Sequence, residues 1–132
     1  MANIRNLDQD RAKHAWGAVQ AATKLKDDAP KKYGREAKKM PVRIMTAGLG
    51  QALAFIEAKA EKHRELRNLH ADLTTWVFEG RKLKKPDDAK TLLDTVIRSD
   101  STFLRMATDE VLAYLQWLNR FAEAEGLTDE LE

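Results

Sequence analysis

The sequence predicts an all-α protein: a compact single-domain helical bundle of about five to six helices over residues 1–132, with frayed ends at 1–7 and 126–132. Apolar residues recur at spacings of three and four along most of the chain, which is the period of an amphipathic helix. No segment alternates apolar and polar residues for more than a few positions. A length of 132 residues, 43% of them hydrophobic and 33% charged, suits one globular domain.

Proline, glycine and capping residues set the expected helix boundaries. In chain order the expected helices cover 8–26, 30–39, 41–64 and 66–79, then one containing Leu92 to Ile97 and one starting at Ser101. Pro41 is expected to end the second helix and begin the third, because proline lacks the N–H that an interior helical residue donates. Gly80 suits a C-terminal cap. Asp87 or Asp88 is expected to cap the fifth helix.

Two of these helices have the clearest apolar pattern. In the first helix the apolar side is formed by Ala12, Ala15, Trp16, Val19 and Ala22. In the last helix the spacing is strictly three or four, at Leu104, Ala107, Val111, Tyr114, Leu115, Leu118 and Phe121. Aromatic residues at these spacings indicate core packing more than base stacking.

The stretch from Ile44 to Ile56 carries no charge, although one-third of the chain is charged. In helical projection its large residues form one stripe and its small residues lie opposite, which predicts a central helix with neighbours on two sides. We therefore predict close helix packing at Gly48, Leu49, Gly50 and Ala54. A phosphate-binding loop is the weaker interpretation, because "GLGQAL" lacks the third glycine of GxGxxG and no strand precedes it.

No pattern of catalytic or metal-binding residues stands out. The chain has no cysteine, which excludes disulfides and zinc thiolates. His63 and His70 are seven residues apart, roughly 10 Å along a helix, which is too far to share a metal without a third ligand. Ser99 and Ser101 have no histidine nearby. We predict a protein that is not an enzyme, with no cofactor, no metal and no small-molecule substrate.

Nothing in the sequence indicates a membrane. The N-terminal "MANIRNLDQD" has no apolar core of a signal peptide. The longest uncharged run is shorter than the roughly 18–20 residues that a membrane helix needs. We expect a cytoplasmic protein.

The charges are unevenly distributed along the chain. Residues 1–86 hold 19 Lys or Arg against 10 Asp or Glu, a balance of +9, whereas residues 87–132 hold 4 against 11, a balance of −7. A polarised molecule of this kind can bind a polyanion. It can also bind a copy of itself, basic part to acidic part, and such contacts can propagate into a filament. A surface whose charges are merely solvated is the third interpretation.

The most basic stretch is "KKYGREAKKMPVR", in which Glu36 is the single acid. Clustered cations of this density suit a nucleic-acid backbone. No motif that reads bases is present, which indicates phosphate contacts with little base preference. Our candidate residues for contact with a nucleic-acid backbone are Lys31, Lys32, Arg35, Lys38, Lys39, Arg43, Lys59 and Arg67.

Four segments, in order, resemble a known family. "DQDRAKHAW", "YGREAKKMP", "IMTAGLGQALAF" and "TDEVLAYLQWLNRFAEA" are similar to the small subunit of the CRISPR type III-B effector, the Cmr complex. The most specific element is "GLGQALAF" after a basic segment and a proline. The resemblance covers most of the chain.

The resemblance implies a non-catalytic structural subunit that takes part in antiviral defence. Its expected partners are the backbone and large Cmr subunits, further copies of itself, guide RNA and target RNA. Copies are expected to stack in a filament and to line the channel where the two RNAs pair, while catalysis belongs to other subunits. The alternative is a helical DNA-binding or transcription-regulating domain, although the alanine- and glycine-rich segment after Pro41 does not suit a recognition helix.

Overall fold

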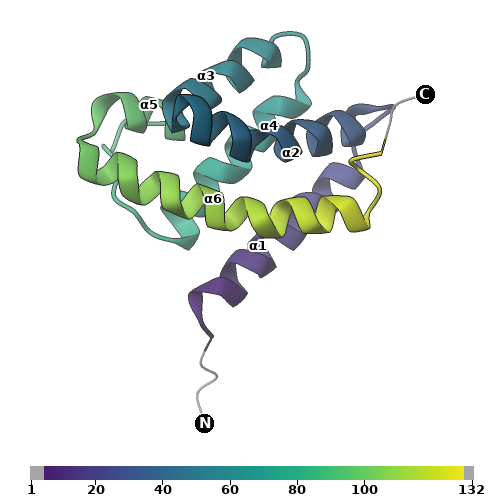
Figure 1. The fold of residues 1–132 in the computed structure, drawn as a ribbon, viewed down its shortest axis with the longest axis horizontal. Coiled ribbons are helices and arrows are strands. Elements are labelled where there is room, and N and C mark those ends of the chain that lie inside the picture. Colours follow the sequence, from purple (N-terminus) through teal and green to yellow (C-terminus); the bar gives the residue numbers. More distant parts are fainter. Residues whose placement is uncertain (1–4, 130–132) are drawn as a thin grey trace.

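The computed structural model describes residues 5–129 and confirms the all-α prediction. Within this range the elements are α1 (Leu7–Thr23), α2 (Ala29–Ala47), α3 (Leu49–Ala60), α4 (Glu65–Thr75), the π-helical turn η1 (Trp76–Gly80), α5 (Leu92–Arg98) and α6 (Ser101–Ala124). The long helix α6 crosses the whole molecule, and α1 and α2 both pack against it (Figure 1). Helix α4 packs against α2 and α3. No helix among the described residues is long and apolar enough to cross a bilayer.

Residues near both ends of the described chain make specific contacts with the rest of the structure. Asn6 caps α1 in a reciprocal capping box: its side chain accepts from the Gln9 N–H, and the Gln9 side chain accepts from the Asn6 N–H. Near the other end, Leu127 is buried in the core. The predicted fraying of 1–7 and 126–132 stays a prediction; within it, Asn6 caps α1 and Leu127 packs on the core, and residues 1–4 and 130–132 lie outside the described range.

The second expected boundary also differs from the structure. Helix α2 continues through Pro41 to Ala47, and the chain turns at Gly48 instead. A proline inside a helix costs about 3 kcal/mol, and here its neighbours Met40 and Ile44 are buried in the core, which offsets that cost. Gly48 has φ +92°, a conformation that glycine adopts without strain, and it separates α2 from α3.

The predicted small-residue packing face is mostly wrong. Gly48 and Ala54 are exposed, and a Cβ added at Gly48 would meet nothing within 4 Å. Leu49 is buried in the core. A Cβ at Gly50 would lie 3.5 Å from Val96 Cγ1, which is an ordinary contact. The helical projection failed because it assumed one continuous helix, whereas the turn at Gly48 changes the direction of the chain.

A close approach between two backbone segments occurs instead at Gly34 in α2. A Cβ there would lie 2.6 Å from the Leu127 Cβ and 2.5 Å from its carbonyl oxygen. Only glycine lets the segment after α6 lie flat on α2 at this point. A second close approach occurs at Gly80, where an added Cβ would lie 2.1 Å from Cε3 of Trp76. Gly80 therefore lies against the Trp76 ring inside η1, and the residue at the cap is Arg81.

Helix α5 begins at a cap that differs from the predicted one. Thr91, not Asp87 or Asp88, accepts from the Asp94 N–H at 3.1 Å. The two preceding free N–H groups are satisfied by α4: the Leu92 N–H donates to Thr74 Oγ1 at 3.0 Å, and the Leu93 N–H donates to His70 Nε2 at 3.3 Å. Because His70 Nε2 accepts, its Nδ1 carries the proton that faces Glu57.

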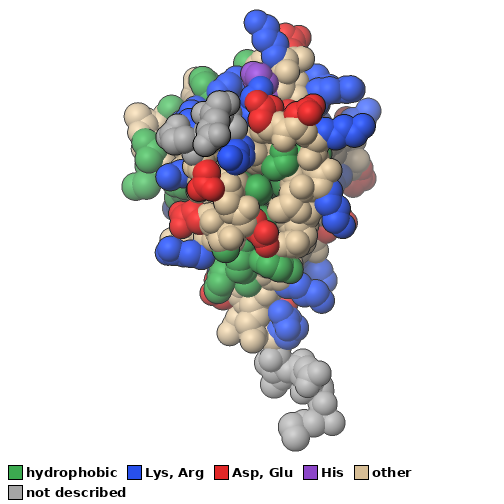
Figure 2. Space-filling view, turned by 90° about the vertical axis from the view of Figure 1, so that its right-hand side faces the viewer, with side chains coloured by type: hydrophobic (Ala, Val, Ile, Leu, Met, Phe, Trp, Pro, Cys, Tyr) green, Lys and Arg blue, Asp and Glu red, His purple; other side chains and the backbone are tan. Residues whose placement is uncertain are grey.

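The charge difference between the two parts of the sequence is partly neutralised in space. Helix α1, from the basic part, packs along α6, from the acidic part. On the face that Figure 2 shows, Lys and Arg side chains are interspersed with Asp and Glu side chains. The folded molecule is therefore less polarised than its sequence.

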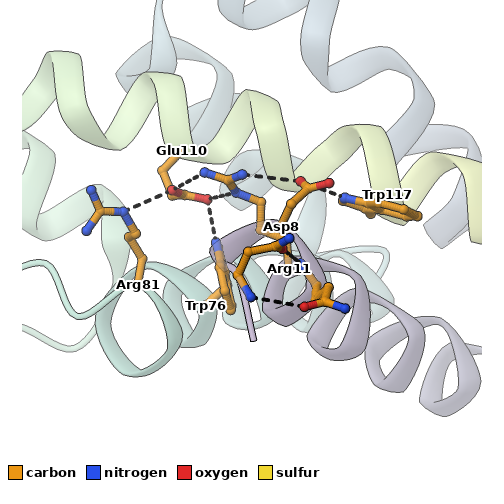
Figure 3. Close-up of polar contacts among 8 residues, drawn as sticks. Asp8, Arg11, Trp76, Arg81, Glu110 and Trp117 are labelled. Carbon is orange, nitrogen blue, oxygen red and sulfur yellow. Dashed lines mark hydrogen bonds and ion pairs between the residues drawn. The ribbon is translucent and has the colours of Figure 1, made fainter. Parts of the chain in front are cut away.

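A buried carboxylate joins these two parts. Glu110 on α6 is 4% exposed and accepts from Arg11 Nε at 2.6 Å and Arg11 Nη2 at 3.0 Å. Trp76 Nε1 donates to it at 2.9 Å and Arg81 Nε at 3.2 Å, so α1, η1 and α6 converge on one side chain (Figure 3). Burial raises the pKa of the Glu110 carboxyl, but the hydrogen bonds from Arg11 and Trp76 outweigh it and hold the pKa below its ordinary value.

Glu110→Gln should destabilise the fold by about 2–4 kcal/mol at pH 7, because it leaves Arg11 without its buried counter-ion. Since folding lowers the Glu110 pKa, its stabilisation is present above the unfolded pKa and is lost as the pH falls through the folded pKa. Urea unfolding of the natural protein and of Glu110→Gln should therefore show a difference in the free energy of unfolding that shrinks below about pH 4. The control is Asp109→Asn, an exposed neighbour on α6. An equal effect of both substitutions would contradict this account.

Gly34→Ala should also destabilise, by about 1–3 kcal/mol, because the new methyl group overlaps the backbone of Leu127. Gly17→Ala is the matched control, since a Cβ at Gly17 in α1 would meet nothing within 4 Å. It should stabilise by up to about 1 kcal/mol through helix propensity alone. Thermal unfolding of the two variants measures the difference, and a stabilised Gly34→Ala would show that the approach is loose.

Candidate nucleic-acid interface

The candidate interface is built where α3 folds back along α2. Glu36 lies in the middle of α2, and Arg43 follows it two turns later on the same side of the helix. Lys59 comes from the last turn of α3. The Glu36 carboxylate accepts from Arg43 Nη1 at 2.6 Å and from Lys59 Nζ at 2.5 Å. One acid therefore holds two cations from two helices at a fixed place.

Glu36 is itself 5% exposed, so its charge depends on these two partners. Burial raises the pKa of the Glu36 carboxyl, but the hydrogen bonds from Arg43 and Lys59 outweigh it, and the pKa lies below its ordinary value. The group is ionised at neutral pH. Arg43 and Lys59 remain partly exposed on its outer side and can still contact a solvent-side anion.

Phe55 completes the cluster. It is 44% exposed on α3. The guanidinium carbon of Arg43 lies 4.0 Å from the centre of its ring, and Lys59 Nζ lies 5.3 Å from that centre. These are cation–π distances. The cations on Glu36 are thus placed over an aromatic ring that solvent also reaches.

Three surface hollows adjoin this cluster. One, of about 550 Å³, is lined by Arg35, Lys38, Lys39, Val42, Arg43 and Thr128. The second, of about 580 Å³, shares Val42 and Arg43 with the first and is lined further by Thr46, Ala47, Gln51, Ala52, Ala54 and Phe55. The third is lined by Lys32, Arg35, Glu36, Lys39, Lys59, His63 and Leu66. Glu36 is the single acid among these linings. The hollows therefore form one continuous basic surface.

The structure brings most of the predicted cations together. Six of them lie along α2, namely Lys31, Lys32, Arg35, Lys38, Lys39 and Arg43, and Lys59 joins them from α3. Lys38 and Lys39 are exposed, with no ion pair among the described residues. Lys32 Nζ lies 3.9 Å from Asp28 Oδ1 and 3.4 Å from His63 Nδ1.

Arg67 is in a different place. It lines a hollow of about 440 Å³ beside α4, together with His70, Thr74 and Phe78. Glu57 and Glu79 also line that hollow, so its charge is mixed. The structure does not group Arg67 with the cations of α2.

Sequence reasoning missed the two residues that organise the surface. Glu36 is the single acid of a basic stretch, but its burial depends on the turn at Gly48, which the sequence did not reveal. Phe55 gave a usable signal, because it lies outside the apolar stripe of its helix and four residues before Lys59. An aromatic residue off the buried stripe and next to a cation is a reason to consider a surface role.

The fold and this surface define a class: a small helical protein with a basic, partly aromatic face. A comparison with family models places residues 7–125 in the family described as CRISPR-associated protein (Cas_Cmr5). The match covers most of the chain, and the chain belongs to the Cmr5 family, as the sequence resemblance predicted. This membership disfavours the DNA-binding alternative.

Two relatives come from Thermus thermophilus. The CRISPR system Cmr subunit Cmr5 of that organism is 34% identical over 122 residues, covering 92% of this chain and 96% of the relative. The X-ray crystal structure of a CRISPR-associated Cmr5 family protein from Thermus thermophilus matches with a TM-score of 0.71 and 29% identity, covering 91% of this chain and 97% of that one. The helical fold is therefore shared over nearly the full length of both chains.

Proposed function

We propose that this protein is a non-catalytic structural subunit of a type III-B Cmr effector and that the basic surface of α2 contacts RNA there. Its partners are the backbone and large Cmr subunits, guide RNA and target RNA. The observation that carries the proposal is the basic surface itself, where the linings of three hollows hold six cations and one buried acid. Family membership and the name of the Thermus thermophilus relative support the assembly.

The buried and half-buried ionisable groups support a structural role. Glu110 and Glu36 hold arginine and lysine side chains, and His70 caps α5. Asp72 accepts from the Tyr33 hydroxyl at 2.7 Å, and burial raises the pKa of its carboxyl to about 6. Each of these groups is engaged in holding helices together. In this proposal, catalysis belongs to other subunits of the effector, and the complex works in the cytoplasm.

The surface should contact RNA through phosphates. Lysine and arginine neutralise phosphates without reading bases, so binding should depend on salt and little on sequence. If three or four phosphates of a single strand are contacted, the log–log salt slope should be roughly −2 to −3, at about 0.7 per phosphate.

Lys38→Glu combined with Lys39→Glu should weaken binding of every RNA tested and make the salt slope shallower by about one to two units. The free energy of unfolding should change by less than about 0.5 kcal/mol, because both side chains are exposed. Fluorescence anisotropy on the protein and on the assembled complex measures the affinity. The matched control is Lys24→Glu with Lys26→Glu, an equal charge reversal at positions after α1. Equal losses in both double variants would indicate a general charge effect, and unchanged binding in the Lys38 and Lys39 variant would exclude this face.

We also propose that copies of the chain stack on one another within the complex. The acidic segment 87–132 supports this, because its sequence balance of −7 is only partly neutralised by α1, which packs along α6. Exposed apolar side chains outside that basic surface support it as well: Met45 on α2 is 79% exposed and Ile97 on α5 is 72% exposed. Such side chains are candidates for burial against another protein surface.

Dimers or short stacks should therefore form at low salt and dissociate as salt screens charges beyond about 10 Å at 0.1 M. Sedimentation velocity at about 0.02 M and about 0.5 M salt tests this directly, with and without single-stranded RNA. A monomer under all four conditions would contradict electrostatic stacking. Stacks that survive high salt would instead indicate an apolar contact.

A further inference from the structure

Phe55 has an environment that phosphate binding does not explain. A phosphate contact needs only the cations, yet here Arg43 and Lys59 are held against an aromatic ring that is 44% exposed. The adjoining hollow of about 580 Å³ has no acid in its lining and is formed by small or apolar side chains besides Arg43, Thr46 and Gln51. The ring thus borders an open hollow whose mostly small and apolar lining suits a flat, apolar group.

Glu36 fixes this arrangement before any ligand arrives. It is buried, it accepts from Arg43 at 2.6 Å and from Lys59 at 2.5 Å, and it thereby limits the freedom of two long side chains. Ordering such long, flexible side chains on binding costs conformational entropy. Here that ordering is present in the unbound protein, which is the property expected of a preorganised binding site.

We propose that Phe55, with Arg43 and Lys59, forms a stacking site for one unpaired base of a single-stranded RNA, a proposal that rests on the RNA contact proposed above. Bases stack on aromatic rings and on guanidinium planes with little sequence preference. The hollow beside Phe55 shares Val42 and Arg43 with the hollow of Lys38 and Lys39. A strand whose base occupies the first hollow can thus place its neighbouring phosphates in the second.

A protein partner fits this surface less well. The linings of the two hollows contain four cations and no acid, and the apolar area between them is interrupted by Arg43. Protein interfaces concentrate apolar and aromatic residues at their centre and are depleted in lysine there. A base with flanking phosphates combines a flat apolar face with negative charge. The aromatic ring and the cations of this surface complement those two features.

The test is a double-mutant cycle between the protein and the RNA. A short single-stranded RNA is compared with the same RNA carrying abasic sites, which keep the phosphates and remove the bases. For the natural protein, abasic RNA should bind about 5- to 100-fold more weakly. For Phe55→Leu the two RNAs should bind nearly equally. The salt slope should be the same for both proteins, because no phosphate contact is removed.

Two further variants keep the outcome clear. Trp16→Leu removes an aromatic side chain of similar exposure, 45%, on α1 and should retain the full preference for RNA with bases. Phe55→Trp should retain or increase that preference, so it guards against a fold defect in Phe55→Leu. Salt-dependent binding with no preference for bases in the natural protein would overturn the stacking site alone and leave this hollow for a protein subunit. No salt-dependent binding at all would overturn the proposed RNA contact, and the stacking site with it.

Discussion

A buried carboxylate cannot remain charged without partners, and this constraint determines how the molecule is assembled. Glu110 is the clearest case, because burial alone would favour its neutral form. Arg11 and Arg81 supply the opposite charge, and the indole of Trp76 supplies a further hydrogen bond. These donors come from α1 and η1, with Arg81 directly after η1. The orientation of α1 on α6 and the π-helical form of the η1 turn are therefore linked to a single side chain.

The same constraint operates at Glu36, with a different outcome. At Glu110, Arg11 closes a contact between α1 and α6, and the buried indole of Trp76 is a further donor. At Glu36, Arg43 and Lys59 reach inward for the acid but keep an outer side that solvent reaches. A buried acid can thus stabilise a fold in one place and arrange surface cations in another. Through Arg43 and Lys59, the buried Glu36 therefore connects the core of this protein to its candidate interface.

The sequence predicted the features that depend on local pattern and missed those that depend on where the helices meet. Helical periodicity placed α1 and α6 to within a few residues, and charge density identified the basic stretch of α2. Gly48 was predicted to pack, but it makes a turn, because its positive φ is not encoded in the pattern of its neighbours. Gly34 was overlooked, since the need for glycine there comes from Leu127, about ninety residues away. The family resemblance correctly predicted membership of the Cmr5 family, which helical periodicity alone could not indicate.

Helix α5 shows how unevenly the fold distributes its resistance to opening. It has only seven residues, too few to be helical alone, and two of its first N–H groups depend on Thr74 and His70 of α4. Its Ile97 is largely exposed, so little apolar burial holds its outer side. Segments of this kind exchange amide hydrogens through local unfolding, well before the core does. We expect the amides of α5 to exchange together, as one cooperative unit, whereas those of α6 exchange only through global unfolding.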